Sequence, residues 1–186
     1  MPRYKLTIEY DGGGFVGWQR QENGLSVQQV LEEAIKKFCG EATTLFGAGR
    51  TDTGVHALGQ VAHFDLAGAA EVDTIRDALN FHVKPAAISI LATELVDDDF
   101  HARFSATERA YLYRIINRRS PLTLDKGRAW HVIVPLDSEA MAEAGMALVG
   151  FHDFTSFRSV HCQAESAEKT MNHIAVTRQD EEIQLL

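Results

Sequence analysis

Hydrophobic and polar positions alternate strictly at the start of the chain. Tyr4, Leu6, Ile8 and Tyr10 fall on one side of an extended segment, and charged or polar residues fall between them. A period of two is typical of a β-strand with one covered face. The pattern therefore predicts a strand over residues 3–10.

A helical period follows. Apolar residues between positions 27 and 38 recur at spacings of three and four, which is the pattern of one helix face. Ser26, with Gln29 three residues later, is the signature of a capping box, and Gly40 is typical of the position just after a helix. We expect a helix between Ser26 and Gly40.

The rest of the chain contains further short periodic segments. The patterns predict strands at 59–65, 87–96, 105–117, 130–134, 172–178 and 182–186, a helix at 73–81 and another helix between Asp137 and Gly150. Strands interspersed with helices indicate an α+β fold, as two related α/β halves that share a mixed, mainly antiparallel sheet. We expect an N-terminal half over 1–100, a C-terminal half over 101–186 and a cleft between them as the natural binding site. The last predicted strand ends at Leu186 without a turn or polar tail, which favours a chain whose second half is incomplete.

Composition places the chain among ordinary globular proteins, with 45% hydrophobic and 24% charged residues. Its two cysteines, Cys39 and Cys162, lie far apart, and its eight histidines show no metal-ligand spacing. We therefore expect neither a disulfide framework nor a metal site. Two isolated cysteines fit a reducing cytoplasm, which is the expected location, and no apolar stretch reaches the length of a membrane helix.

The net charge of -8 argues against a generally basic nucleic-acid surface. Residues 103–128, here called the basic segment, differ from the rest of the chain because they contain seven arginines and lysines and two acidic residues. Tyr111 and Tyr113 lie among these charges. Such a segment could follow a phosphate backbone beside stacking rings, or it could be a solvated strand face.

The densest motif is the glycine-rich stretch GAGRTDTGVH, residues 47–56, here called the catalytic-loop candidate. Glycine permits tight backbone conformations, so the loop can present Arg50 and Asp52, one residue apart, to a ligand. The Arg50 cation suits contact with a phosphate or with an inserted base, and the Asp52 carboxylate suits a catalytic step. The motif matches neither of the glycine patterns of nucleotide-binding loops, and a solvated turn is the alternative.

The longer stretch GAGRTDTGVHALGQVAHFD, residues 47–65, resembles the central motif of the TruA family of tRNA pseudouridine synthases almost letter for letter. Other matches follow the family's order: YDGGGFVGWQRQ (10–21), FHARF (100–104), ERAYLYRI (108–115), WHV (130–132) and HDFTSFR (152–158). Together they cover nearly the whole chain.

The resemblance implies a cofactor-free isomerase that converts uridine to pseudouridine at positions 38 to 40 of the tRNA anticodon stem-loop. It implies that Asp52 is the nucleophile, that Arg50 helps to displace the target uridine and that Tyr111 stacks on the flipped base. It also implies a homodimer in which one tRNA contacts both subunits.

The sequence departs from the family pattern in three places. Gly13 and Gly14 stand where a threonine usually follows YDG, and residues 167–169 replace a usual proline and arginine. Family members also continue beyond the point of Leu186, with an arginine that pairs with the catalytic aspartate. We therefore expect an incomplete site in this chain.

The chemistry of the reaction agrees with these roles. Isomerisation breaks the bond from N1 to the ribose and rejoins the uracil through C5, without net redox change or water, so it requires no metal or organic cofactor. One carboxylate suffices, whether it attacks the ribose, attacks the uracil or removes a ribose proton to give a glycal. Base flipping costs on the order of a few kcal/mol of unstacking, which an inserted side chain and an aromatic ring can offset.

Two other functions are consistent with parts of the sequence. A catalytically silent RNA-binding fragment would keep the basic segment without turnover. A nucleotide hydrolase using the glycine-rich loop is disfavoured, because no phosphate-loop lysine or set of metal-binding carboxylates accompanies it.

Overall fold

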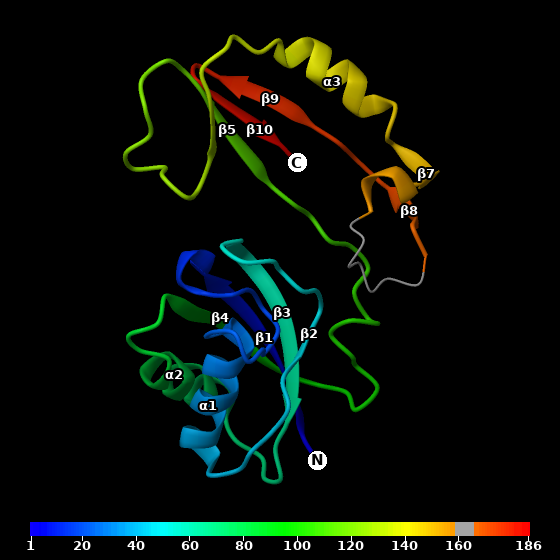
Figure 1. The fold of residues 1–186 in the computed structure, drawn as a ribbon. Coiled ribbons are helices and arrows are strands. Elements are labelled where there is room, and N and C mark those ends of the chain that lie inside the picture. The colour runs from blue at the N-terminus through cyan, green and yellow to red at the C-terminus, as the bar shows by residue number, and fades with distance from the viewer. Residues whose placement is uncertain (159–165) are drawn as a thin grey trace. The chain divides into compact units, whose positions relative to one another are not determined.

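The computed structural model describes residues 1–158 and 166–186 (Figure 1), which form two compact units, Met1–Glu108 and Arg109–Leu186. Both units combine helices with strands, so the α+β class is confirmed. The described strands are grouped in two four-stranded sheets and one two-stranded sheet, rather than in the single sheet that the sequence favoured. None of the described helices is long and apolar enough to cross a membrane.

The first unit is an antiparallel sheet with two helices. Its elements are β1 (Arg3–Tyr10), the 3-10 turn η1 (Gly12–Gly14), α1 (Val27–Cys39), β2 (Phe46–Gly47), β3 (Ala57–Asp65), α2 (Val72–His82) and β4 (Ile88–Val96). The strand order is β2-β3-β1-β4, with β1 paired antiparallel to both β3 and β4. The two helices lie on one side of this sheet (Figure 1).

The core of this unit lies between that face of the sheet and the helices. The alternation of β1 is confirmed: Tyr4, Leu6, Ile8 and Tyr10 are at most 2% exposed. They belong to one cluster with the apolar faces of α1 and α2. Because full burial of one such side chain contributes about 1.5–3 kcal/mol, this face accounts for much of the unit's stability.

The ends of α1 are also as the sequence indicates. The Ser26 side chain accepts a hydrogen bond from the Gln29 amide, and Gly40 adopts the left-handed conformation, with φ of 81°. The Gly40 amide donates to the carbonyl oxygen of Lys36, which closes the last turn.

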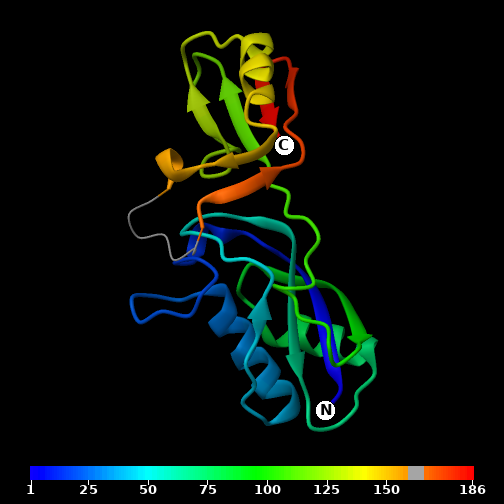
Figure 2. The ribbon, with the colours of Figure 1, turned by 90° about the vertical axis from the view of Figure 1, so that its right-hand side faces the viewer.

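The second unit contains a smaller sheet and a separate strand pair. Its elements are β5 (Tyr113–Asn117), β6 (Trp130–Val132), α3 (Ser138–Met146), β7 (Gly150–Asp153), the 3-10 turn η2 (Thr155–Phe157), β8 (Glu168–Met171), β9 (Val176–Gln179) and β10 (Glu182–Leu185). The order β6-β5-β10-β9 is mixed, because β5 and β6 are parallel and the other pairs antiparallel. Helix α3 packs beside β9 (Figure 2), and β7 pairs with β8.

Several boundaries in this unit differ from the expected ones. The long strand expected over 105–117 is confined to β5, which is the stretch that pairs with β10 on one side and with β6 on the other. Asp137 caps α3 as expected by accepting from two backbone amides, but the helix ends at Met146, earlier than the apolar pattern indicated. The pair β7 and β8 was not predicted.

Candidate active site

The catalytic-loop candidate connects β2 to β3 in the first unit. Its first part is fixed to β3 by two hydrogen bonds. The Ala48 amide donates to the Val61 carbonyl oxygen at 2.8 Å, and the Gln60 side-chain amide donates to the Gly49 carbonyl oxygen at 2.8 Å. The chain therefore enters the loop at a defined place beside the sheet.

The middle of the loop is held at Thr51. Its carbonyl oxygen accepts a hydrogen bond from the Trp18 amide at 3.0 Å, and its Oγ1 lies 2.8 Å from the Tyr10 hydroxyl. Tyr10 and Trp18 are each 2% exposed. Thr51, which lies between Arg50 and Asp52, is thus hydrogen-bonded to the side chain of one core residue and to the backbone of another.

The last part of the loop is held by the same segment that contains Tyr10 and Trp18. The Thr53 hydroxyl donates to the Val16 carbonyl oxygen at 3.1 Å. The Gly12 amide donates to Nδ1 of His56 at 3.1 Å, and Asp11 Oδ1 lies 3.1 Å from the same nitrogen. Residues 10–18, here called the cradle, therefore contact the loop from its middle to its end.

Two glycines let the cradle approach this closely. A Cβ atom at Gly17 would lie 2.6 Å from the Thr51 carbonyl oxygen, and Gly17 has φ of 115°, which side chains other than glycine rarely adopt. A Cβ atom at Gly12 would lie only 2.0 Å from the Val55 carbonyl oxygen. The glycines of the cradle are explained by contact with the loop.

The loop places Arg50 and Asp52 at the surface, where both are exposed. A turn follows directly, in which the Val55 amide donates to the Asp52 carbonyl oxygen at 3.2 Å and Gly54 adopts φ of 78°. A guanidinium and a carboxylate are therefore both exposed on one anchored loop, accessible to a ligand.

Comparison with known proteins covers the segments that form this candidate site. The family model described as tRNA pseudouridine synthase matches residues 6–105, a range that includes the cradle and the whole loop. The chain is 61% identical over all 186 residues to tRNA pseudouridine synthase A of Parvibaculum lavamentivorans, and covers 76% of that protein. This chain belongs to the tRNA pseudouridine synthase family. The corresponding enzyme of Paramagnetospirillum magneticum is 60% identical over the whole chain, with 73% of that protein covered, and that of Maricaulis maris is 57% identical, with 74% covered.

Tyr111, the third site residue predicted from the sequence, lies in the second compact unit of this synthase-family chain. It precedes β5 by two residues, and its side chain is 56% exposed. It also lies outside the residues that the family model matches. Its assignment to the same site as Asp52 stays a prediction.

The basic segment is partly neutralised by carboxylates. Arg114 forms a bidentate pair with Glu182, at 2.7 and 2.9 Å, and an ion pair with Asp125 at 2.9 Å. Arg118 pairs with Glu181 at 3.1 Å. Because these two glutamates lie on and beside β10, far along the chain, counting charges over 103–128 overestimated the positive charge of this surface.

The ion pair with Arg114 strongly favours the charged form of Glu182. Hydrogen bonds from Arg114 and then from Gln184 hold the pKa of Glu182 at about 2. Such a short, bidentate pair lies on the sheet of the second unit and joins β5 to β10. Arg114 thus has a structural partner, and the exposed cations of this segment are Arg103, Arg109, Arg119, Lys126 and Arg128.

No group of three or more histidine, cysteine or carboxylate residues suited to a metal occurs in the part of the chain that the structure describes. His161 and Cys162 lie outside the described residues. Cys39 is a half-buried thiol at the end of α1, whose Sγ donates to the Ile35 carbonyl oxygen at 3.2 Å.

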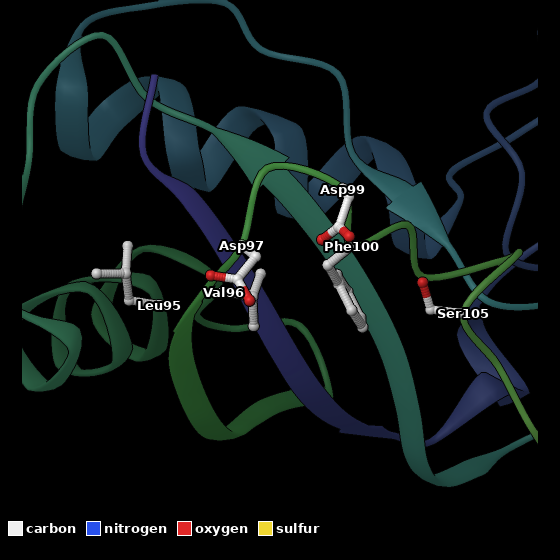
Figure 3. Close-up of a pocket in the computed structure, with 6 residues that line it drawn as sticks. All are labelled: Leu95, Val96, Asp97, Asp99, Phe100 and Ser105. Atoms are coloured by element: carbon white, nitrogen blue, oxygen red, sulfur yellow. The ribbon is translucent and has the colours of Figure 1, made fainter.

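A cavity of about 380 Å³ lies at the end of β4, and it shares no lining residue with the loop or the cradle. Figure 3 shows its lining: Leu95, Val96, Asp97, Asp99, Phe100 and Ser105. Two carboxylates in this lining make it unsuited to a phosphate backbone. The anchored loop, and not this cavity, is therefore the candidate site for a nucleic-acid substrate.

Sequence reasoning proposed Arg50 and Asp52 as site residues but missed the residues that hold their loop. Tyr10 and Gly17 contact the loop directly at Thr51, and nothing in the spacing of these residues along the chain shows this. The one available signal was that the family match extends to YDGGGFVGWQRQ, the segment that contains the cradle.

Proposed function

We propose that this chain is a tRNA pseudouridine synthase that isomerises uridines 38 to 40 of the anticodon stem-loop. The observation that carries the proposal is the loop that exposes Arg50 and Asp52 and is anchored through the half-buried Thr51 to the buried Tyr10. Membership of the family supplies the reaction, since the relatives at 57 to 61% identity are named tRNA pseudouridine synthase A.

Asp52 is the nucleophile in this proposal. Its carboxylate assists cleavage of the bond between N1 and C1′ of the uridine, the uracil turns, and a bond forms between C5 and C1′. The proton on C5 leaves and N1 gains one, so atoms and electrons balance without a metal, an organic cofactor or water. An exposed carboxylate on a fixed backbone suits such an attack.

Base flipping gives Arg50 and Tyr111 their roles. A uridine in a stem is stacked, so it must leave the helix before a side chain can reach its ribose. Arg50 fills the vacated position and contacts the neighbouring phosphates, and Tyr111 stacks on the extruded base. The exposure of the Tyr111 ring supports the second role.

The proposal also covers the roles of the two halves of the chain, the oligomeric state and the cellular location. It places catalysis in the N-terminal half, over residues 1–100, and RNA contacts of the basic segment in the C-terminal half, over 101–186. It includes a homodimer whose two subunits contact one tRNA, in the cytoplasm. The exposure of cations such as Arg119 and Lys126 supports the part of this division that concerns RNA contacts.

Release of tritium from an anticodon stem-loop labelled at C5 of its uridines tests the proposal, because forming pseudouridine expels the C5 hydrogen. The chain should release tritium, and Asp52→Asn should release none while its RNA affinity stays within about twofold, since amide and carboxylate are nearly isosteric. Glu71→Gln, at an exposed position before α2 without a side-chain cap hydrogen bond, is the control for the loss of one negative charge elsewhere. Turnover by Asp52→Asn would refute the assignment of the nucleophile.

RNA binding without turnover is the second candidate function. It is favoured by one observation: the chain aligns with 73 to 76% of each of the three relatives, so each has residues with no counterpart among these 186. Equal RNA affinity of the chain and of Asp52→Asn, with no tritium release from either, would support it over the synthase.

A further inference from the structure

Thr51 is the residue of the Arg50-Thr51-Asp52 sequence that the protein body holds. Its neighbours on both sides are exposed, whereas Thr51 is half-buried. It is bonded at two points, through its carbonyl oxygen to the Trp18 amide at 3.0 Å and through its Oγ1 to the Tyr10 hydroxyl at 2.8 Å. Neither bond is used by the chemistry described above.

Anchoring Thr51 orients Asp52 for a simple covalent reason. The Thr51 carbonyl group belongs to the planar peptide unit that ends at the Cα atom of Asp52. When Trp18 fixes the direction of this carbonyl, it fixes the plane from which the Asp52 side chain departs. The Tyr10 bond holds the other side of the same residue, so Thr51 cannot rotate to relax the plane.

Tyr10 is itself well placed to act as an anchor. It is the last residue of β1, its ring lies in the core, and the ring centroid is 6.2 Å from that of Trp18. Burial raises the pKa of its phenol against the opposing effects of hydrogen bonds with Thr51 and Gln60, so the hydroxyl keeps its proton. Gln60 in turn holds the Gly49 carbonyl oxygen, which extends the same network to the start of the loop.

We propose that Tyr10 and Thr51 are positioning residues of the synthase, and that the bond between their side chains sets the orientation of the Asp52 carboxylate. The inference rests on the proposed function and adds to it two residues that do not touch the substrate. A displacement of a reacting group by about 1 Å costs about 100-fold in rate, so loss of this bond should lower kcat, while KM, which reflects RNA contacts elsewhere, should change little.

The chain offers a closely matched control on the same strand. Tyr4 is also buried, at 1% exposure, and its hydroxyl donates to the Ala70 carbonyl oxygen at 3.0 Å and accepts from the Ala70 amide at 2.8 Å. Tyr4→Phe therefore removes a buried, hydrogen-bonded hydroxyl at the opposite end of β1, without any contact to the loop. A purely structural role predicts similar effects of the two substitutions.

The kinetic test compares Tyr10→Phe, Thr51→Val and Thr51→Ser with Tyr4→Phe. We expect Tyr10→Phe and Thr51→Val each to lower kcat by about 10-fold to 100-fold with KM within about twofold, and the double variant to be no slower than either single one. Thr51→Ser, which keeps the hydroxyl, and Tyr4→Phe should retain kcat. Wild-type kcat in Tyr10→Phe, or an equal fall of kcat in Tyr4→Phe, would overturn the inference.

A second readout needs no turnover. Hydrogen exchange of the Trp18 amide reports directly on its bond to Thr51, and should be at least about 10-fold faster in Tyr10→Phe than in the chain itself or in Tyr4→Phe. If the chain itself releases no tritium, the proposed function fails and this exchange rate alone decides the inference. Unchanged exchange in both Tyr10→Phe and Thr51→Val would then refute it.

Discussion

The Trp18 amide donates a hydrogen bond to the Thr51 carbonyl oxygen at 3.0 Å, which joins two of the segments that resemble the family. The Trp18 ring also lies against the start of the loop, since a Cβ atom at Gly47 would be 2.7 Å from its Cε2. One buried residue thus contacts the loop at its first residue and at its middle. The conformation of the loop therefore depends on the core of the first unit.

Gly17→Ala should test this dependence. The added methyl would meet the Thr51 carbonyl oxygen at 2.6 Å, in a backbone conformation with φ of 115°. We expect a loss of stability on the order of 2 kcal/mol in urea unfolding, together with a large fall in tritium release, because the Thr51 carbonyl must move. Gly40→Ala is the control, since Gly40 also has positive φ, 81°, but open space around it. It should lose stability and keep turnover, and equal turnover in both variants would contradict the role of the contact.

Elements whose apolar pattern faces a single core were predictable from the sequence. The strand at 3–10 and the helix between Ser26 and Gly40 have the expected bounds, because burial and capping both act locally there. The strand expected over 105–117 shows the limit. Alternation indicates where a strand is possible, but the extent of pairing depends on residues distant in the sequence, here those of β10 and β6 opposite Tyr113–Asn117.

The candidate site was predictable in its chemistry but not in its support. Arg50 and Asp52 are close in sequence, so a short motif reveals both. The support comes from Tyr10 and Gly17, whose bond and close approach to Thr51 exist only after β1 and the loop have folded together. Likewise, the charge of Arg114 is offset by Glu182, which is distant in sequence and adjacent in the sheet.

RNA binding should weaken steeply with salt despite the acidic overall charge. Arg118→Ala combined with Arg119→Ala should reduce the slope of log affinity against log salt by up to about 1.4, since each phosphate contact to single-stranded RNA contributes about 0.7. Arg119 should contribute more than Arg118, which pairs with Glu181 at 3.1 Å. Fluorescence anisotropy of a labelled stem-loop at several salt concentrations measures the slope. Lys36→Ala with Lys37→Ala, in the last turn of α1, should leave it unchanged, and an equal reduction by both pairs would contradict the assignment.

Glu182→Gln should destabilise the second unit. The pKa of Glu182 is lowered to about 2 by Arg114, so its contribution is present above the unfolded value of about 4.5 and is lost as pH falls through 2. Because both side chains are 27% exposed, we expect a loss of only about 1 kcal/mol in urea unfolding at pH 7. Glu181→Gln, in the more exposed pair with Arg118, should cost less. A larger cost for Glu181→Gln would show that the bidentate geometry is not the stabilising feature.

Acid should destabilise the first unit through His63. This histidine is 2% exposed, and its Nδ1 accepts a hydrogen bond from the Ala102 amide at 3.1 Å, which requires an unprotonated nitrogen. Burial lowers its pKa to about 4, with smaller contributions from His101 and Arg3 in the same direction and an opposing one from Asp65. The His101 ring lies 4.7 Å away, and the aromatic rings of Phe46 and Phe100 also lie beside the His63 ring. His63 is therefore neutral in the folded protein at a pH where an unfolded chain already binds the proton.

The sign of the effect follows from linkage. Between the unfolded pKa of about 6.5 and the folded value of about 4, the unfolded state binds more protons, so the free energy of unfolding should fall by up to about 1.4 kcal/mol for each pH unit as acid is added. Urea unfolding measured between pH 7.5 and pH 4.5, in steps of about half a pH unit, gives the slope. His63→Gln, whose side-chain oxygen can accept from Ala102 without titrating, should flatten it, whereas His173→Gln at an exposed position should not. A slope that is the same in His63→Gln as in the unmodified chain would show that another group governs acid stability in this range.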